Sequence, residues 1–587
     1  MLERARAVGT QPRAGTRVLF VVVLLVAAAA HWPALRAPLV LDDFDQRAMI
    51  EGRLTPSRNL FDLFDFVADD NRASLLDRGA LPWWSDPLLK TRFLRPLPSL
   101  LVWLDYKLSG YHSFAPHLRS LFWWAVAVAA AGTLFRSVLS ERAAAVGTLV
   151  FALSPAHTVP IWWLANRDVL VSVAVGSFAL ARYVRWRHGR SKRDGAISTC
   201  LWAAAMLTGE YALCFTGYVA AIEFARRGDT VARRMSGLAV FALPLFAYLG
   251  IRAALGYGVH GSGFYHDPLA DLGSYMSGTP RAFAILLGAA WFGIEDRWSA
   301  SASLEQLVLV GAAIVVAMGI ARGSAMRRQD VRSRSATLWL LGGSVLALLP
   351  VAAVQPSTRL LAVGALGVCA LIGVVIDAAW TDMTEGMWRS WERAPSTAVT
   401  AVAALGLVYA HFIHVPVQAY WFSRRATEEE PVYSRRLAWV RENLSPSKTT
   451  VVVLRGTTPT TALAAPFMLR SAAPERWRVL TQAFGRLVAV RSGSRSLDVV
   501  QDGAEPLVYL GPSDPVRAAG MGGGETFEVP GMRTTVVSVD GSGQPGRLRF
   551  EFDRDLDAPS FWWIVEGENG FREVRLPSVN QGVRLLR

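Results

Sequence analysis

Three aspartates follow the first long apolar segment of the chain. Asp42, Asp43 and Asp45 lie in the stretch LVLDDFDQRAM, directly after an apolar run that begins at Arg17. Such carboxylates are either the solvated end of a helix or groups held against a substrate at the boundary of water and lipid. A desolvated carboxylate has a raised pKa and can take a proton from an attacking alcohol. Asp42 and Asp43 are therefore candidates for a general base, and their spacing alone does not choose between them.

Polar side chains also occur at the ends of other apolar segments, as a site built from several helices requires. Arg359 is the lone cation between two apolar segments, at a point that the pattern of basic loops places on the non-cytoplasmic side. It can hold a phosphate leaving group through two parallel hydrogen bonds, or it can simply reach the lipid headgroups. The other polar residues at such ends are Arg92, Arg95, His157, Asn166, Arg167, Asp168, Glu210, His266 and Asp267.

The chain that carries these residues is too apolar for a soluble protein of its size. Of its 587 residues, 52% are hydrophobic and only 18% are charged, whereas about 25% of the residues of soluble proteins are charged. Roughly 20 apolar residues in a helix cross a hydrocarbon core of about 30 Å, and many segments reach that length. The composition predicts a mainly α-helical, polytopic membrane protein.

The net charge of +14 comes from short basic clusters between the apolar segments. Clusters such as 182–193 and 321–334 are typical of cytoplasmic loops rather than of a nucleic-acid surface. The three cysteines, Cys200, Cys214 and Cys369, lie inside apolar segments and show no metal-binding spacing. The sequence thus predicts no nucleic-acid partner, no disulfide framework and no zinc site.

Alternation of the basic loops predicts about eleven transmembrane helices. The first, at about 17–35, is interpreted as an uncleaved helix rather than a signal peptide because so many apolar segments follow. Segment 281–294 is interpreted as re-entrant or interfacial, since a full crossing there would place the basic cluster 321–334 outside. The remaining spans are expected at 117–136, 143–160, 168–184, 195–208, 211–225, 236–255, 304–321, 335–354, 359–379 and 397–415.

Two segments are predicted to lie outside the membrane on the same side. Residues 36–116 form a large outer loop with amphipathic stretches such as LFDLFDFV, suited to interfacial helices, and long loops usually shape a functional site. From about residue 426, short alternating stretches separated by Gly, Pro and Asp predict strands. We therefore expect a transmembrane catalytic domain over 1–425 and a soluble, strand-rich domain, β-sandwich-like or α+β, over 426–587.

The order of several motifs resembles that of a known superfamily. An acidic pair after the first helix, a large first loop, and then FLRPL, LSPAHTVPIWWLANRDVL and LTGEYAL resemble the C-type membrane glycosyltransferases (GT-C). Within them, they resemble the protein O-mannosyltransferase-like branch that includes the transmembrane and tetratricopeptide-repeat enzymes. The resemblance covers about 17–380. Ser154, Val159 and Gly209 stand where that branch usually has His, Glu and Lys, and the tail lacks the repeats, which leaves the donor and acceptor open.

The resemblance implies a glycosyltransferase whose site faces the non-cytoplasmic side. Asp42 or Asp43 would be the base, with Asp42 favoured, and a polyprenyl-phosphate sugar would be the donor. Its sugar, mannose or another hexose, would be transferred with inversion to an acceptor hydroxyl. A divalent cation, Mg²⁺ or Mn²⁺, held by Asp43 and Asp45 is compatible with the sequence but not required by it. The residues that would bind the donor phosphate and sugar are Arg95, His157, Arg167, Asp168, Glu210 and Arg359.

Two alternatives remain open on the sequence. The same fold could modify a lipid or a cell-wall glycan instead of a protein. The chain could also be a transporter or an assembly scaffold, although its polar groups gather at the ends of spans and transporters place them at mid-membrane. In the favoured interpretation the protein is a multi-pass protein of a bacterial inner membrane, with its active site and tail on the extracytoplasmic side.

Overall fold

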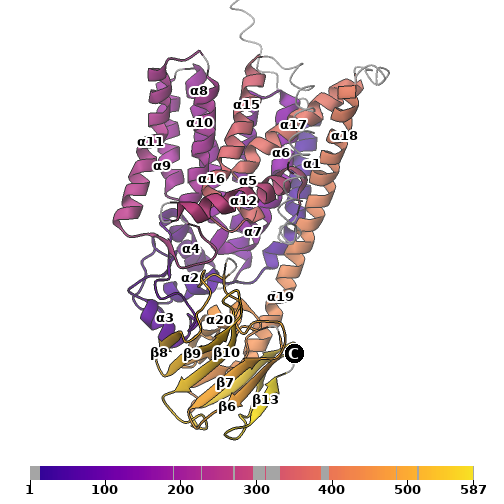
Figure 1. Cartoon of the computed structure of the whole chain (residues 1–587). Coiled ribbons are helices and arrows are strands. Elements are labelled where there is room, and N and C mark those ends of the chain that lie inside the picture. Colours follow the sequence, from indigo (N-terminus) through magenta and orange to yellow (C-terminus); the bar gives the residue numbers. More distant parts are fainter. Residues whose placement is uncertain are drawn as a thin grey trace, which may run out of the picture.

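The structure is a computed structural model of the whole chain. Helices dominate up to Asn443, and strands dominate from Thr450 onward (Figure 1). The protein is therefore mostly helical with a strand-rich C-terminal part, as the sequence predicts. The structure describes residues 14–110, 112–189, 191–226, 228–266, 268, 271–294, 311, 331–384, 395–483, 485–511 and 514–585.

In the described part of the chain, six helical stretches are long and apolar enough to cross a membrane. A seventh is added if α6 (Glu141–Leu153) and the segment Pro155–Trp162, which meet at 44°, form one span. The bend occurs because Pro155 cannot continue the hydrogen-bond ladder of α6. The protein is thus a multi-pass membrane protein, while the predicted number of eleven spans is not confirmed. The six stretches are Phe114–Val138 (α5), Leu164–Gly189 (η4, Leu164–Asn166, and α8, Asp168–Gly189), Val231–Ala254 (α11), Ser333–Val351 (within α15, Val331–Leu346, and α16, Leu348–Val351), Gly364–Thr384 (α17) and Ala398–Asn443 (within α18, Pro395–Tyr409, then η8, Ala410–His414, and α19, Val415–Asn443).

Several predicted spans take another form. Two of them fall on helices too short to cross a hydrocarbon core, which needs about 17 residues or more. Segment 281–294, predicted to be re-entrant or interfacial, forms much of the second half of α12 (Leu272–Phe292). The span predicted at 304–321 lies outside the described residues apart from Gly311. The two short helices are α9 (Lys192–Met206) and α10 (Phe215–Ala225), joined by η5 (Glu210–Cys214).

The first loop is folded and follows α1 (Ala14–Ala30) and η2 (Trp32–Arg36). Its two short strands pair with a third strand from the loop after α11, in the antiparallel order β1-β2-β3. Helix α4 begins at Pro96, a residue favoured at the first helical position because the N–H that it lacks would be unpaired there. The elements are α2 (Asp42–Ile50), β1 (Asp65–Val67), α3 (Arg72–Arg78), β2 (Lys90–Arg92), α4 (Pro96–Ser109) and β3 (Gly258–His260).

The strand-rich part contains two sheets. Six antiparallel strands follow the order β13-β6-β7-β10-β9-β8, and four strands follow the order β12-β11-β4-β5. In the second sheet β11, β4 and β5 are parallel, and two short helices connect β4 to β5, because parallel neighbours need a crossover. This part is therefore α+β. Its elements are β4 (Thr450–Val453), α20 (Pro459–Leu463), α21 (Ala465–Leu469), β5 (Arg476–Val479), β6 (Leu487–Arg491), β7 (Ser496–Gln501), β8 (Thr526–Val529), β9 (Met532–Val539), β10 (Pro545–Phe552), β11 (Phe561–Gly567), β12 (Gly570–Glu573) and β13 (Gly582–Leu585).

Helix α19 links the helical part directly to the strand-rich part. It continues without a break from Val415 to Asn443, and Figure 1 shows it descending from the other helices to the strands. The domain boundary predicted between residues 425 and 426 therefore falls inside a continuous helix.

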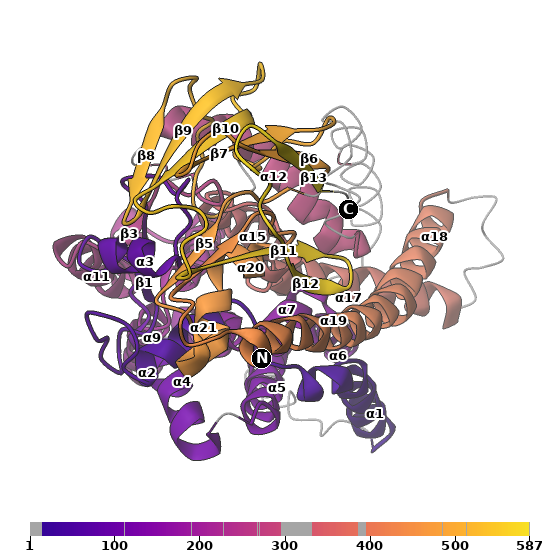
Figure 2. The ribbon, with the colours of Figure 1, turned by 90° about the horizontal axis from the view of Figure 1, so that it is seen from below.

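The first loop and the strand-rich part share one hydrophobic core. The ring of Trp83 packs edge-on against Phe527 and Phe550, with centroids 5.4 and 5.7 Å apart, and its indole N–H donates to the carbonyl of Leu480 at 3.1 Å. Figure 1 shows α2, α3 and α4 at the same end of the helices as the strands, and Figure 2 shows that end from below. The tail thus closes over the first loop.

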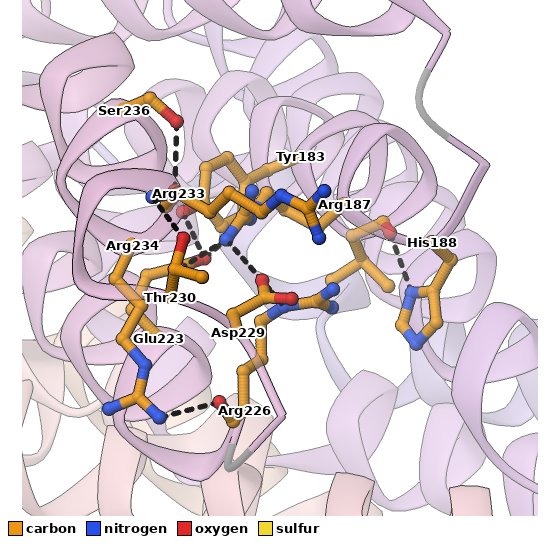
Figure 3. Close-up of polar contacts among 11 residues, drawn as sticks. Tyr183, Arg187, His188, Glu223, Arg226, Asp229, Thr230, Arg233, Arg234 and Ser236 are labelled. Atoms are coloured by element: carbon orange, nitrogen blue, oxygen red, sulfur yellow. Dashed lines mark hydrogen bonds and ion pairs between the residues drawn. The ribbon is translucent and has the colours of Figure 1, made fainter.

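A polar network joins helices at the opposite end. Glu223 of α10 accepts hydrogen bonds from the hydroxyl of Tyr183 at 2.6 Å and from Nε of Arg187 at 2.7 Å, both on α8. Asp229 pairs with Arg187 and Arg226 at 2.9 and 2.8 Å (Figure 3). This network ties the end of α8 to α10 and the turn before α11, far from the first loop.

Candidate active site

A cavity of about 740 Å³ lies where the helices, the first loop and the strand-rich part meet. Most of its wall is apolar, but two carboxylates and two guanidinium groups also face it. This volume lies within the range of roughly 300–1,000 Å³ that small-molecule sites have. The polar side chains that line it are Asp42, Asp45, Thr91, Arg95, Asn166, Ser262, Tyr265, Arg359, Tyr433, Thr458 and Thr460.

Asp42 is the first residue of α2 and lies half-buried in the cavity wall. The preceding Leu41 has a φ of 41°, a left-handed conformation that residues with a side chain rarely adopt. Burial raises the pKa of Asp42 to about 6, and the nearby guanidinium groups of Arg359 and Arg95 oppose the rise. A carboxylate with this pKa is ionised at neutral pH and can accept a proton, as a general base must.

Asp43 does not line this cavity and instead holds the backbone. Its Oδ2 accepts the N–H of Val40 at 3.0 Å, its Oδ1 accepts the N–H of Ala165 at 2.8 Å, and the side chain is fully buried. Burial raises the pKa of Asp43 to about 7, while these two hydrogen bonds oppose the rise. Consecutive helical residues are about 100° apart around the axis, which explains why the two neighbours face different surroundings. Asp43 thus ties α2 to η4.

Asp45 lines the cavity one helical turn after Asp42. Burial and the charges of Asp42 and Asp43 raise the pKa of Asp45 well above its ordinary value. Of the two residues considered for a metal, Asp43 and Asp45, only Asp45 lines the cavity, and both oxygens of Asp43 accept backbone N–H groups. Among the described residues, no group of three or more His, Cys, Asp or Glu side chains could hold a metal ion. No chemical step is therefore assigned to a metal.

Arg95, Asp168 and Glu210 form an ion-pair network at the edge of the cavity. Nη1 of Arg95 lies 3.1 Å from Oδ2 of Asp168, and its Nε lies 3.6 Å from Oε2 of Glu210. Arg252 holds the other oxygen of Glu210 at 3.1 Å. The guanidinium of Arg95 also lies over the ring of Phe93, 4.4 Å from its centroid. Three of the predicted residues are thus brought together, and the two carboxylates fix Arg95 in the cavity wall.

Gly209 makes room for this network. Its φ is 113°, and a Cβ built on it would lie only 2.6 Å from Cγ of Arg95. The lysine that the O-mannosyltransferase-like branch usually has at this position would clash with Arg95 in the present arrangement. Here Arg95 and Arg252 supply the positive charge beside Glu210.

Arg359 faces the cavity from η6 (Thr358–Leu360). Its guanidinium lies over the ring of Trp163, 5.5 Å from the centroid. Within the described ranges, no carboxylate comes within 4.0 Å of its nitrogens. A half-buried cation that faces Asp42 and is paired with no carboxylate of the described residues is suited to bind an anionic group of a ligand.

Two predicted residues, His157 and Arg167, do not reach the cavity. Nε2 of the buried His157 is hydrogen-bonded to the carbonyl of Phe151 at 2.9 Å. Arg167 forms an ion pair with Asp105 and donates to the carbonyl of Pro116 at 3.2 Å. Both side chains therefore hold neighbouring elements together.

Other residues of the site carry little or no signal in the sequence. Arg252 shares the signal of Arg359, a cation at the predicted outer end of an apolar span, and could have been found in that way. Tyr265 lines the cavity, whereas the nearby Asp267 lies outside the described residues. Phe467 lines it from the tail, and only the folded chain reveals that a residue so distant from Asp42 belongs to the same wall.

The comparisons with known sequences point to one group of enzymes. No family model matches the chain. It is 27% identical over 192 residues to the protein O-mannosyl-transferase TMTC3 of Mus musculus, and 25% identical over 195 residues to that of Homo sapiens. The chain is similar to protein O-mannosyl-transferases. This confirms the predicted resemblance, although each match covers 32% of the chain and the chain spans less than a fifth of these relatives, 18% and 19%.

Solved structures of two membrane proteins are also similar. ArnT from Cupriavidus metallidurans, bound to undecaprenyl phosphate, has a TM-score of 0.42 and 15% identity, covering 78% of this chain and 85% of ArnT. The archaeal oligosaccharyltransferase AglB from Archaeoglobus fulgidus, in complex with an inhibitory peptide and a dolichol-phosphate, has a TM-score of 0.43 and 15% identity, covering 79% and 64%. Because both TM-scores are below 0.5, these likenesses alone support no conclusion about function.

Proposed function

We propose that the protein is a membrane glycosyltransferase that moves a sugar from a polyprenyl-phosphate donor to an acceptor hydroxyl. The observation that carries this proposal is that Asp42 and Arg359 face one cavity without forming an ion pair. A base and an unpaired cation are the two groups that such a transfer needs on opposite sides of the sugar. The similarity to protein O-mannosyl-transferases supports the same reaction class.

In the proposed reaction Asp42 takes the proton of the acceptor hydroxyl. The hydroxyl oxygen then bonds to the anomeric carbon, while the bond from that carbon to the phosphate oxygen breaks, so the configuration inverts. The lipid phosphate leaves with the electron pair, and Arg359 stabilises its charge. Arg95 contributes positive charge nearby, but Asp168 and Glu210 already engage its nitrogens, which makes Arg359 the principal phosphate ligand.

The proposal includes a side of the membrane. The first loop and the strand-rich part lie at the same end of the helices (Figure 1), and residues of both line the cavity. The basic clusters in the sequence favour the opposite end for the cytoplasm. The proposed site therefore faces the extracytoplasmic side. A topology reporter inserted next to Asp43 checks this assignment, and a cytoplasmic signal would contradict it.

A transfer assay tests the reaction. Purified protein is incubated with a panel of polyprenyl-phosphate sugars and acceptor fractions, and release of polyprenyl phosphate is measured. We expect turnover with one donor and a loss of about 10²–10⁴-fold in Asp42→Asn, the usual contribution of a general base. Asp69→Asn is the matched control, because this carboxylate lies in the same loop and its side chain is 90% exposed. Full turnover in Asp42→Asn would rule out Asp42 as the base.

A further inference from the structure

The cavity has two chemically different regions. Around Asp42 and Arg359 it is charged, whereas the wall formed by the first loop and the tail is apolar. We call this second region the apolar wall. It includes Leu54, Phe66 and Leu75 of the first loop and Leu463, Phe467 and Met468 of the tail.

The apolar wall contains few groups that could bind a polar ligand. Thr91, Thr458 and Thr460 supply hydroxyls near it. Among the described residues, no charged side chain of the tail lines the cavity. An extended peptide would bring a backbone N–H and C=O at every residue, and each buried group without a partner costs free energy. A folded domain is too large for a cavity of about 740 Å³. The wall therefore suits an apolar body rather than a peptide backbone or a folded protein.

A second cavity, of about 560 Å³, lies beside the first. Phe422 and Ala426 of α19 line both cavities, and Thr358, next to Arg359, lines the second. The second cavity is lined by α19, by Pro155, Thr158 and Val159 of the bent segment and by residues 293–294 and 357–358, and its wall carries Gln418 and Arg425 beside apolar side chains such as Val415 and Trp421. Because this cavity runs along α19, which belongs to a stretch long and apolar enough to cross a membrane, it offers a place for the lipid carrier and leaves the apolar wall for the other substrate.

We propose that the acceptor is an amphiphilic alcohol, a molecule with an apolar body and a hydroxyl head, and that the strand-rich tail forms half of its binding wall. This inference rests on the proposed transferase function. The apolar body lies against the first loop and the tail, and the hydroxyl reaches Asp42 at the charged region. The tail is thus part of the substrate site and determines which acceptors enter.

Acceptors of three classes separate this proposal from its rivals. With one active donor, transfer is measured to a long-chain or isoprenoid alcohol glycoside in detergent, to a Ser/Thr peptide, and to a free water-soluble sugar. We expect kcat/KM for the amphiphilic alcohol to exceed that for the other two by about 10-fold or more, the discrimination that an apolar pocket gives. Equal or faster transfer to the peptide or the free sugar would overturn the inference while leaving the transferase function intact.

Variants of the tail test its role directly. Ala464 is almost fully buried and lines the cavity from the junction of α20 and α21, so Ala464→Trp fills the space beside the apolar wall. We expect the KM for the alcohol to rise about 10-fold while the KM for the donor stays within about twofold. Ala504→Trp is the matched control, because Ala504 is exposed and lies elsewhere in the tail.

An unfolding measurement and a second variant complete the test. Thermal unfolding identifies a variant that fails to fold, and Leu463→Trp, which fills the same cavity from α20, then replaces Ala464→Trp. Unchanged alcohol KM in a folded Ala464→Trp or Leu463→Trp would overturn the role of the tail. If no acceptor class supports consumption of any donor, the proposed function is overturned, and this inference with it.

Discussion

Asp42 and Asp43 are neighbours in the chain, and their substitution by Asn should have opposite consequences. Asp42 faces the cavity, so Asp42→Asn should lower turnover by about 10²–10⁴-fold and leave the fold intact. Asp43 holds the N–H groups of Val40 and Ala165, so Asp43→Asn should lower stability. The amide of Asn keeps one accepting oxygen and presents an NH₂ group to the other N–H.

The magnitude follows from the two hydrogen bonds. Leaving one buried donor unpaired costs about 1–3 kcal/mol, so Asp43→Asn should lose about this much stability, and Asp43→Ala, which loses both bonds, about 2–6 kcal/mol. Asp42→Asn removes a charge that lies at the cavity surface and accepts no such pair of bonds. Because burial raises the pKa of Asp42, its charge destabilises the folded state at neutral pH, so we expect Asp42→Asn to leave the unfolding free energy unchanged or to increase it.

The assay combines two readouts for each variant. Thermal unfolding in detergent is followed at a fixed scan rate, since membrane proteins often unfold irreversibly. Polyprenyl-phosphate release is measured at a temperature well below the lowest unfolding midpoint. A folded, inactive Asp43→Asn beside an active Asp42→Asn would refute the assignment of base and anchor.

Three other perturbations test the site and its supports. The rate of transfer should fall as the pH is lowered through about 6, because Asp42 must be ionised to act as the base. Arg359→Gln should move this fall in rate to higher pH, since Arg359 lowers the pKa of Asp42. A profile of kcat/KM between about pH 5 and 8 measures both effects. Gly209→Ala should reduce activity because its Cβ clashes with Arg95. In the Arg95→Ala background the same substitution should cost less, because only the backbone strain at Gly209 remains. A double-mutant cycle of transfer rates and unfolding midpoints measures the difference. Trp83→Ala should cost about 3–5 kcal/mol and release the tail to limited proteolysis, whereas unchanged protection would contradict the shared core.

Much of the architecture can be predicted from the sequence because the bilayer imposes simple length and charge rules. These rules locate the long apolar helices and the basic loops, and the alternating stretches of the tail locate its strands. They predict the apolar character of α9 and α10 but not their lengths of 15 and 11 residues, which are shorter than a transmembrane helix usually needs. The bend at Pro155 likewise depends on one residue inside an otherwise apolar segment.

The candidate site is harder to predict, because a motif gives position along the chain but not rotation about a helix. Arg167 and Asp168 are adjacent, yet Arg167 pairs with Asp105 and Asp168 pairs with Arg95. In the same way, Asp42 faces the cavity whereas its neighbour Asp43 accepts two backbone N–H groups. The role of the tail in the site could not be predicted from the motifs for another reason. Its contacts join residues that are far apart in the chain, and such contacts leave no local pattern in the sequence.

The core shared by the first loop and the tail also has a consequence for how the protein is made. The hydrogen bond from Trp83 to Leu480 spans 397 residues, and the ion pair of Arg470 with Glu51 spans 419. During synthesis the first loop therefore emerges long before the segment that covers it, and its apolar side chains stay uncovered until the tail has been made. The apolar wall forms only after the last strands have reached the same side of the membrane as the first loop. An incompletely synthesised chain would thus carry Asp42 without a closed site around it.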